Sequence, residues 1–156
     1  MVKKTLTPAS RLKAQFDSYD DMVEHITKNI VSSAGTADYI GNAAKELYNE
    51  LHSIARSSYK HAKGQVIEGH VLPHKMVVDC VYLACNAGGV RISARRVQHL
   101  MLELFKVKVR PEPWKWATPH LDRICEILMC IPADLPLRGA VGGVVESGDS
   151  SGDSTS

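Results

Sequence analysis

The chain has 156 residues, of which 44% are apolar, 23% charged and 6% aromatic, and its formal net charge is +2. This length favours one domain with its own core, and the ordinary glycine, proline and apolar content excludes collagen-like and wholly disordered proteins. The longest apolar run, residues 76–85, is short and contains Asp79, so it cannot span a bilayer. Lys3 and Lys4 are not followed by an apolar stretch. We therefore expect no secretory signal, an intracellular protein, and four reduced cysteines.

The charge is unevenly distributed along the chain. Residues 140–156 contain three acids, five serines and four glycines but no lysine or arginine, so residues 1–139 carry 19 basic and 14 acidic residues. A segment of that composition buries too little apolar surface to become ordered. We therefore predict a flexible basic arm over residues 1–17, a folded domain over 18–137 and a disordered acidic Ser/Gly-rich tail over 138–156.

Two helices are expected at the start of the folded domain. Ser18 and Asp21 resemble a capping box, and helix-spaced apolar residues follow them, so a first helix is expected that Gly35 closes. Thr36 is expected to cap a second helix, whose apolar face spans residues 40–55.

A loop and an apolar helix come next. Residues 60–73 contain Gly64, Gly69 and Pro73, which predicts a loop that is long for a compact domain. Residues 74–87 are apolar on nearly every side, and such a helix belongs in the middle of a bundle. Its narrow polar stripe consists of Lys75, Asp79, Tyr82 and Asn86.

The last two helices are separated by a connection that contains two prolines. Ser93 is expected to cap the fourth helix, which has apolar residues at helical spacing. Residues 107–116 cannot be helical throughout, and the alternation over residues 107–109 is too short to predict a strand. Thr118 followed by Pro119 is typical of a helix start, so a fifth helix is expected there. The domain is therefore predicted to be all-α.

Part of this pattern resembles the core repeat of the transcription factor IIB family. Residues 76–90 (MVVDCVYLACNAGGV) and 91–97 (RISARRV) look like its third and fourth helices, and residues 43–48 are similar to its second helix. The resemblance covers roughly residues 20–131. It implies a single five-helix cyclin-like bundle with a buried central third helix, which binds DNA, a TATA-binding-type factor, or both. The chain departs from the family in having Asp79 where alanine is usual, a single repeat, and no paired CxxC of a zinc ribbon.

A basic stretch around the fourth helix is the candidate binding site. Arginines at the start of this helix would meet phosphates together with its free backbone N–H groups; alternatively, they pair with acids elsewhere. The candidate nucleic-acid-binding residues are Arg91, Arg95, Arg96, Lys106, Lys108, Arg110 and Lys115. Trp114 and Trp116 are candidate partner-binding residues that stack on a base or a partner side chain; the alternative is that they pin the connection onto the bundle.

The cysteines form two pairs with the same spacing, Cys80-x4-Cys85 and Cys125-x4-Cys130. Five residues of a continuous helix rotate by about 500°, so the thiols of each pair should diverge by roughly 140°. Structural zinc sites use shorter spacers in knuckles. We therefore expect buried, inert thiols and no metal site.

Catalytic and cofactor motifs are absent from the sequence. His70 and His74 have i, i+4 spacing, but Pro73 separates them and no glutamate lies between them as in zinc proteases. The sequence contains no G-x-S-x-G, P-loop or GxGxxG motif. We expect no enzyme, no cofactor and no small-molecule substrate.

The favoured hypothesis is a non-enzymatic, nucleic-acid-associated regulator that acts by positioning. The alternative is a cyclin-like interaction module that docks on a kinase or scaffold through a helical face. A third interpretation is a virion or assembly protein whose basic arm meets nucleic acid. Nuclear localisation is expected in a eukaryote or a nuclear virus, and cytoplasmic localisation otherwise.

Overall fold

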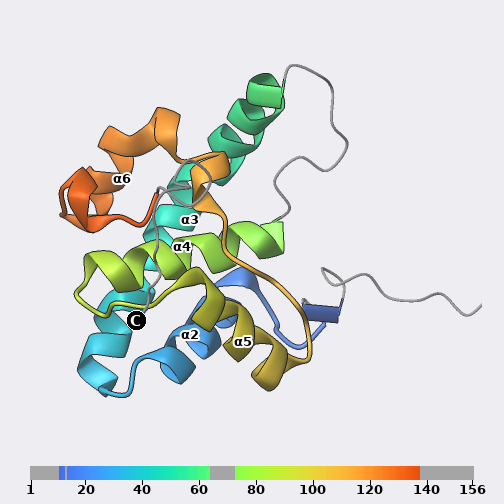
Figure 1. Cartoon of the computed structure of the whole chain (residues 1–156). Coiled ribbons are helices and arrows are strands. Elements are labelled where there is room, and N and C mark those ends of the chain that lie inside the picture. Colours follow the sequence, from blue (N-terminus) through green and yellow to red (C-terminus); the bar gives the residue numbers. More distant parts are fainter. Residues whose placement is uncertain (1–10, 13, 64–72, 138–156) are drawn as a thin grey trace, which may run out of the picture.

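The computed structural model describes residues 11, 12, 14–63 and 73–137, and within these ranges it contains helices and no strand. The all-α prediction is therefore confirmed for this part of the chain. The α-helices are α2 (Tyr19–Ile30), α3 (Ala34–Lys63), α4 (Pro73–Ala87), α5 (Ala94–Phe105) and α6 (Leu121–Leu128), as labelled in Figure 1. Three short 3₁₀ helices are η1 (Pro113–Lys115), η2 (Thr118–His120) and η3 (Pro132–Asp134).

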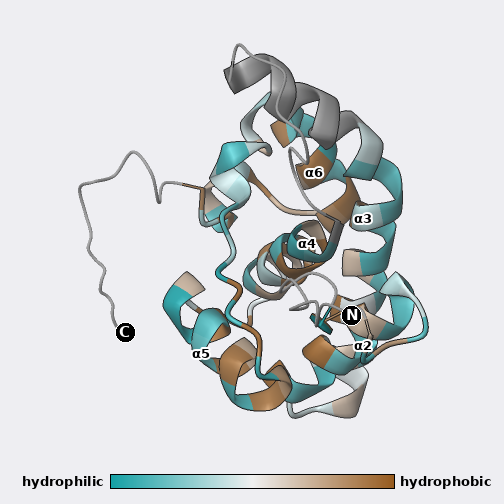
Figure 2. Ribbon diagram, turned by 90° about the vertical axis from the view of Figure 1, so that its right-hand side faces the viewer, coloured by the Kyte–Doolittle hydropathy of each residue, from teal (hydrophilic) through white to brown (hydrophobic). Residues whose placement is uncertain are grey.

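Helix α4 is the centre of the fold. It packs against α2 and α3, and in Figure 2 it lies in the middle of the other helices. Every side chain from residue 76 to residue 86 is buried, which confirms the prediction of a buried third helix. Each neighbouring element covers only one side of a helix. Burial on every side therefore requires that α4 has neighbours all around it. None of the helices in the described ranges has the length and apolarity that a bilayer span requires.

Helix α2 begins as the sequence predicts. The Ser18 hydroxyl accepts a hydrogen bond from the Asp21 N–H at 3.0 Å. The Asp21 carboxylate accepts one from the Asp17 N–H at 3.2 Å, one residue before the N-cap. The second bond of the capping box therefore goes to the residue before the N-cap instead of to the N-cap itself.

The boundary between α2 and α3 differs from the prediction. Helix α2 ends at Ile30, and Ser33, not Thr36, caps α3 by accepting a 3.5 Å hydrogen bond from the Thr36 N–H. Gly35 lies in the first turn of α3 and closes no helix. Gly35 does not have the positive φ that is typical of a glycine at a helix end. The sequence alone does not reveal φ, so the prediction that Gly35 ends the first helix was wrong.

Helix α3 is also longer than predicted. It continues to Lys63, so the loop expected over residues 60–73 does not begin at residue 60. Residues 64–72 lie outside the described part of the chain.

The folded part of the chain begins before residue 18. The Leu12 side chain is fully buried, and the Phe16 ring packs edge-on against Phe105 at 5.3 Å between ring centroids. The Gln15 side chain donates a 3.0 Å hydrogen bond to the Phe105 carbonyl. These residues fall within the flexible arm predicted over residues 1–17, but their core contacts place them with the folded domain. Residues 1–10, 13 and 138–156, which include most of the arm and the acidic tail, lie outside the described ranges.

The two remaining helix starts have different outcomes. Ser93 caps α5 as predicted, accepting from the Arg96 N–H at 3.1 Å. Thr118 does not cap α6, since it begins η2 without a side-chain cap and α6 starts only at Leu121. Proline in the first turn therefore starts a 3₁₀ helix, which continues into the α-helix.

Candidate nucleic-acid interface

The chain that leaves α5 has an inner and an outer face. Lys106 adopts a left-handed conformation (φ 61°) that ends α5 and turns the chain. The residues beyond it are extended, so successive side chains point to opposite sides. On the inner side Val107, Val109, Pro111 and Pro113 are buried, and on the outer side Lys106, Lys108 and Arg110 are exposed. We call residues 106–116 the connecting segment.

Asp79 of α4 anchors the connecting segment. Its carboxylate is completely buried and accepts hydrogen bonds from the Glu112 N–H at 2.8 Å and from the Trp116 Nε1–H at 2.7 Å. Burial raises the pKa of Asp79 to about 7, although the Trp116 and Glu112 hydrogen bonds and the charge of Lys75 act to lower it. The acid inside this apolar helix therefore has two buried hydrogen-bond donors.

An ion-pair cluster reinforces this anchor. The Lys75 ammonium donates to the Glu112 carboxylate and, at 3.1 Å, to the Arg110 carbonyl. The Lys115 Nζ lies 3.3 Å from the same carboxylate. Burial raises the pKa of Glu112, but the hydrogen bonds and charges of both lysines outweigh it and keep that pKa below its usual value. Lys115, one of the predicted nucleic-acid-binding residues, therefore has an acidic partner in this structure.

The other end of α4 holds the turn that enters α5. The Asn86 side chain donates to the Ile92 carbonyl at 3.0 Å and accepts from the Ile92 N–H at 3.3 Å. Tyr82 is buried, which raises its pKa to about 12, although the charge of Arg110 and the Ala94 backbone act to lower it. Lys75, Asp79 and Asn86 of α4 thus bind chain that flanks α5, so α5 is fixed at both ends.

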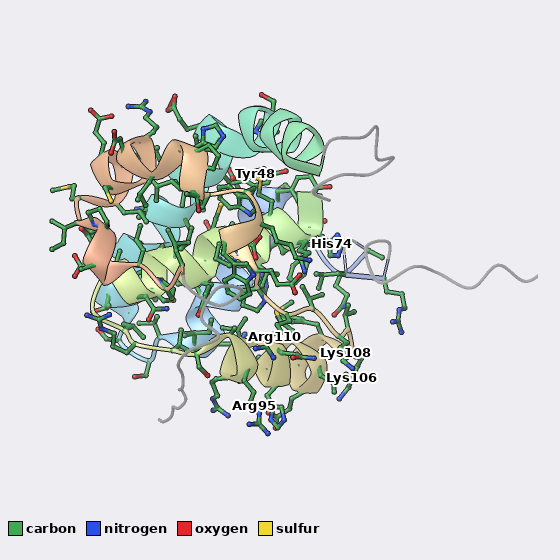
Figure 3. The ribbon with its side chains drawn as sticks, turned by 45° about the horizontal axis from the view of Figure 1, so that its top comes forward. Tyr48, His74, Arg95, Lys106, Lys108 and Arg110 are labelled. Carbon is green, nitrogen blue, oxygen red and sulfur yellow. The ribbon has the colours of Figure 1, made fainter. Side chains whose placement is uncertain are left out.

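Six cations lie on α5 and its flanks without an acidic partner. We call Arg91, Arg95, Arg96, Lys106, Lys108 and Arg110 the α5 cation cluster. All six are exposed, and none forms an ion pair within the described residues. Lys106 donates to the Glu103 carbonyl at 3.0 Å, which leaves its charge uncompensated. Figure 3 shows Arg95, Lys106, Lys108 and Arg110 around α5. The alternative that these arginines pair with acids finds no support in the described ranges.

The backbone at the start of α5 is less available than expected. The Arg96 N–H is bound to the Ser93 hydroxyl. One of the first N–H groups of the helix is therefore already satisfied. Anion contacts at this end of α5 would therefore depend more on side chains than the sequence suggested.

The two tryptophans serve the core. Trp116 is 1% exposed, and its indole N–H is used by Asp79. Trp114 is half-buried and packs against the apolar core. Trp116 is therefore not a partner-binding residue, and the alternative that these side chains pin the connection onto the bundle describes it correctly.

The two cysteine pairs differ. Cys80 and Cys85 are buried within α4, and burial raises the pKa of both thiols, that of Cys85 to about 12. Cys125 and Cys130 are only half-buried. The expected divergence of this second pair is wrong, because α6 ends at Leu128 and no continuous helix joins the two residues.

No group of three or more histidine, cysteine or acidic side chains gathers as a metal site in the described ranges. His74 is buried, and this burial, with the charge of Lys75, lowers its pKa to about 4. His70, which has i, i+4 spacing with His74, lies outside the described residues.

No family model, no curated protein and no solved structure matches this chain. The functional proposal for the chain therefore rests on the α5 cation cluster and on the sequence resemblance given above.

Proposed function

We propose that this protein is a non-enzymatic regulator that binds nucleic acid through the α5 cation cluster, in the manner of a transcription factor IIB-like core that binds DNA, a TATA-binding-type factor, or both. The observation that carries the proposal is the gathering of six exposed cations around one helix, none of which pairs with an acid among the described residues. Uncompensated cations of this kind release counterions from a phosphate backbone when they bind it. Arginine adds a planar donor set that fits phosphate oxygens.

The scaffold beneath the cluster supports this role. Lys108 and Arg110 lie on the connecting segment, which is bound to α4 through Asp79. Arg91 lies next to Ile92, whose carbonyl accepts a hydrogen bond from Asn86 just before α5. Cations on a fixed backbone lose less freedom on binding than cations on a mobile arm. The cluster therefore suits a protein that positions nucleic acid without changing it chemically.

The path of the chain into α5 favours duplex DNA. A turn with Gly89 at φ 93° leads from α4 into α5, and the arginines lie at the start of α5. Helix-turn-helix proteins present the first residues of a helix to the major groove in this way. In this proposal Arg95 and Arg96 face the groove or its phosphates, and Lys106, Lys108 and Arg110 extend the contact along the backbone.

The test is fluorescence anisotropy of a labelled DNA duplex at three salt concentrations. We expect binding that weakens with salt, and a salt slope smaller by about one to two in Arg95→Ala/Arg96→Ala, because each lost phosphate contact removes about 0.9 from the slope. The matched control is Lys45→Ala/Arg123→Ala. It removes the same charge from two residues that pair with Glu24 and Glu50, so its slope should stay within about 0.5 of wild type. Absence of binding at low salt contradicts the proposal.

A cyclin-like docking module remains the second candidate. Leu102 and Leu104 of α5 are 50% and 39% exposed, and exposed apolar side chains on a helix suit a protein partner. Docking through them would depend little on salt. If Leu102→Ser/Leu104→Ser abolished a protein interaction that Arg95→Ala/Arg96→Ala left intact, the docking function would be favoured.

A further inference from the structure

The end of α6 folds back on itself and brings Cys125 and Cys130 together. Met129 adopts a left-handed conformation (φ 55°), and the Cys130 N–H donates a 3.0 Å hydrogen bond to the Cys125 carbonyl. In this type of helix cap the residue after the left-handed position packs its side chain against the residue that accepts the bond. Those two residues are the cysteines.

The surroundings of the thiols agree with this contact. The pKa of Cys130 is raised to about 12, first by burial and then by the charge and hydrogen bond of the Cys125 thiol. The nearness of the Cys125 thiol agrees with the side-chain contact that this helix cap predicts. Both side chains are half-buried and accessible in part to solvent, and no described disulfide involves them.

We propose that Cys125 and Cys130 form a dithiol site that small-molecule disulfides oxidise to an intramolecular disulfide bond. The site lies on α6 and is independent of the α5 cation cluster and of the function proposed for it. The cross-link would join the end of α6 to the segment that carries Leu135, which is buried in the core.

The reaction proceeds by two thiol–disulfide exchanges. The Cys125 thiolate attacks one sulfur of oxidised glutathione, which forms a protein–glutathione disulfide and releases one glutathione thiolate. Cys130 then attacks the Cys125 sulfur, the second glutathione leaves as a thiolate, and the Cys130 proton passes to it. Two protein thiols are oxidised and one glutathione disulfide is reduced to two thiols, so electrons and protons balance.

Cys80 and Cys85 provide an internal control within the same protein. They have the same x4 spacing, but they lie inside the continuous helix α4 and are fully buried. Trypsin separates the two pairs, since residues 76–91 and 124–138 form different peptides. A disulfide oxidant is the suitable probe because a peroxide would also oxidise Met129, which is 80% exposed.

The experiment treats the reduced full-length protein with oxidised glutathione, blocks free thiols under denaturing conditions, and digests it for mass spectrometry. We expect peptide 124–138 to lose two hydrogens and escape blocking at least about tenfold faster than peptide 76–91, because buried thiols react slowly. In concentrated urea this difference in rate should disappear, because unfolding exposes both pairs and the two have the same x4 spacing. Equal rates in the native protein, or a disulfide between two copies of the chain, would overturn the proposal.

Two variants test the roles within the pair. Cys130→Ser should accumulate the glutathione adduct on Cys125, because the second exchange is blocked. Cys125→Ser should likewise stop at a glutathione adduct on Cys130, because no second thiol remains to displace the glutathione. A stable glutathione adduct in the wild type, or no adduct in either variant, contradicts the proposal.

Discussion

Helices α4 and α5 each carry a row of polar side chains, and the two rows meet different surroundings. Three of the polar residues of α4, Lys75, Asp79 and Asn86, bind backbone, indole or carboxylate groups of the connecting segment and of the turn before α5. The cations of α5 and its flanks are exposed and unpaired in the described ranges. The covered row fixes the shape of the molecule, and the exposed row is left available for a ligand. Substitutions in the two rows should therefore affect different measurements.

The largest effect is expected at Trp116, which fastens the connecting segment to α4. Trp116→Ala should lower the free energy of unfolding by about 3–5 kcal/mol, because it opens a cavity and leaves the Asp79 carboxylate with one donor fewer. Urea denaturation followed by circular dichroism measures this loss. A variant of wild-type stability that had lost a binding partner would show instead that this side chain serves an interface.

A smaller effect is expected at Asp79 itself. Asp79→Asn should cost about 1–3 kcal/mol, since an amide presents one acceptor and cannot satisfy both the Glu112 N–H and the Trp116 indole. The loss should be smaller than for Trp116→Ala because no cavity is created. Urea denaturation at neutral pH compares the two directly.

The pH dependence of this loss has a definite sign. The folded-state pKa of Asp79, about 7, lies above its ordinary value of 3.8, so the folded protein holds an extra proton between these two values. The contribution of this group to stability is complete below pH 3.8 and is lost as pH rises through 7. The gap in unfolding free energy between wild type and Asp79→Asn should therefore be larger at pH 5 than at pH 8. A gap that widens with pH would contradict the raised pKa.

The difference between the two rows also shows how far the sequence leads. Helical periodicity and the N-caps Ser18 and Ser93 were sufficient to predict most helices and the central place of α4, because these signals are local. That Asp79 would meet Trp116 was not predictable from spacing, since 37 residues separate them and only the packed structure brings them together. One signal was present nonetheless: an acid inside an apolar helix requires buried donors, and an indole N–H is such a donor.

The candidate site was predicted in part for the same reason. The exposed cations on α5 follow from the helical pattern of residues 94–105. Lys108 and Arg110 owe their exposure to an alternation of buried and exposed side chains that extends from Val107 through Pro113, beyond the 107–109 stretch that is visible in the hydropathy pattern. Lys115 has the same charge, but it pairs with Glu112, an acid three residues earlier. Cys125 and Cys130 were misplaced because the end of α6, set by Met129, could not be located from spacing alone.

The smallest effect on stability is expected on the outer face of the connecting segment. Lys108→Ala/Arg110→Ala removes two exposed side chains that have no acidic partner, so the free energy of unfolding should change by less than about 0.5 kcal/mol. The salt slope of DNA duplex binding should nevertheless decrease by about one to two if the connecting segment follows the phosphate backbone. Urea denaturation and anisotropy on the same preparation separate the two quantities.

Val109→Ala is the matched control for this outer-face variant. Its side chain is 4% exposed on the inner face of the same segment, so truncation should cost stability, by about 1–3 kcal/mol, and leave the salt slope within about 0.5 of wild type. The two variants should therefore have opposite effects on stability and salt slope, although Val109 lies directly between Lys108 and Arg110. If Lys108→Ala/Arg110→Ala left the salt slope unchanged while Arg95→Ala/Arg96→Ala reduced it, the contact would be confined to the start of α5. The connecting segment would then act as scaffold on both of its faces.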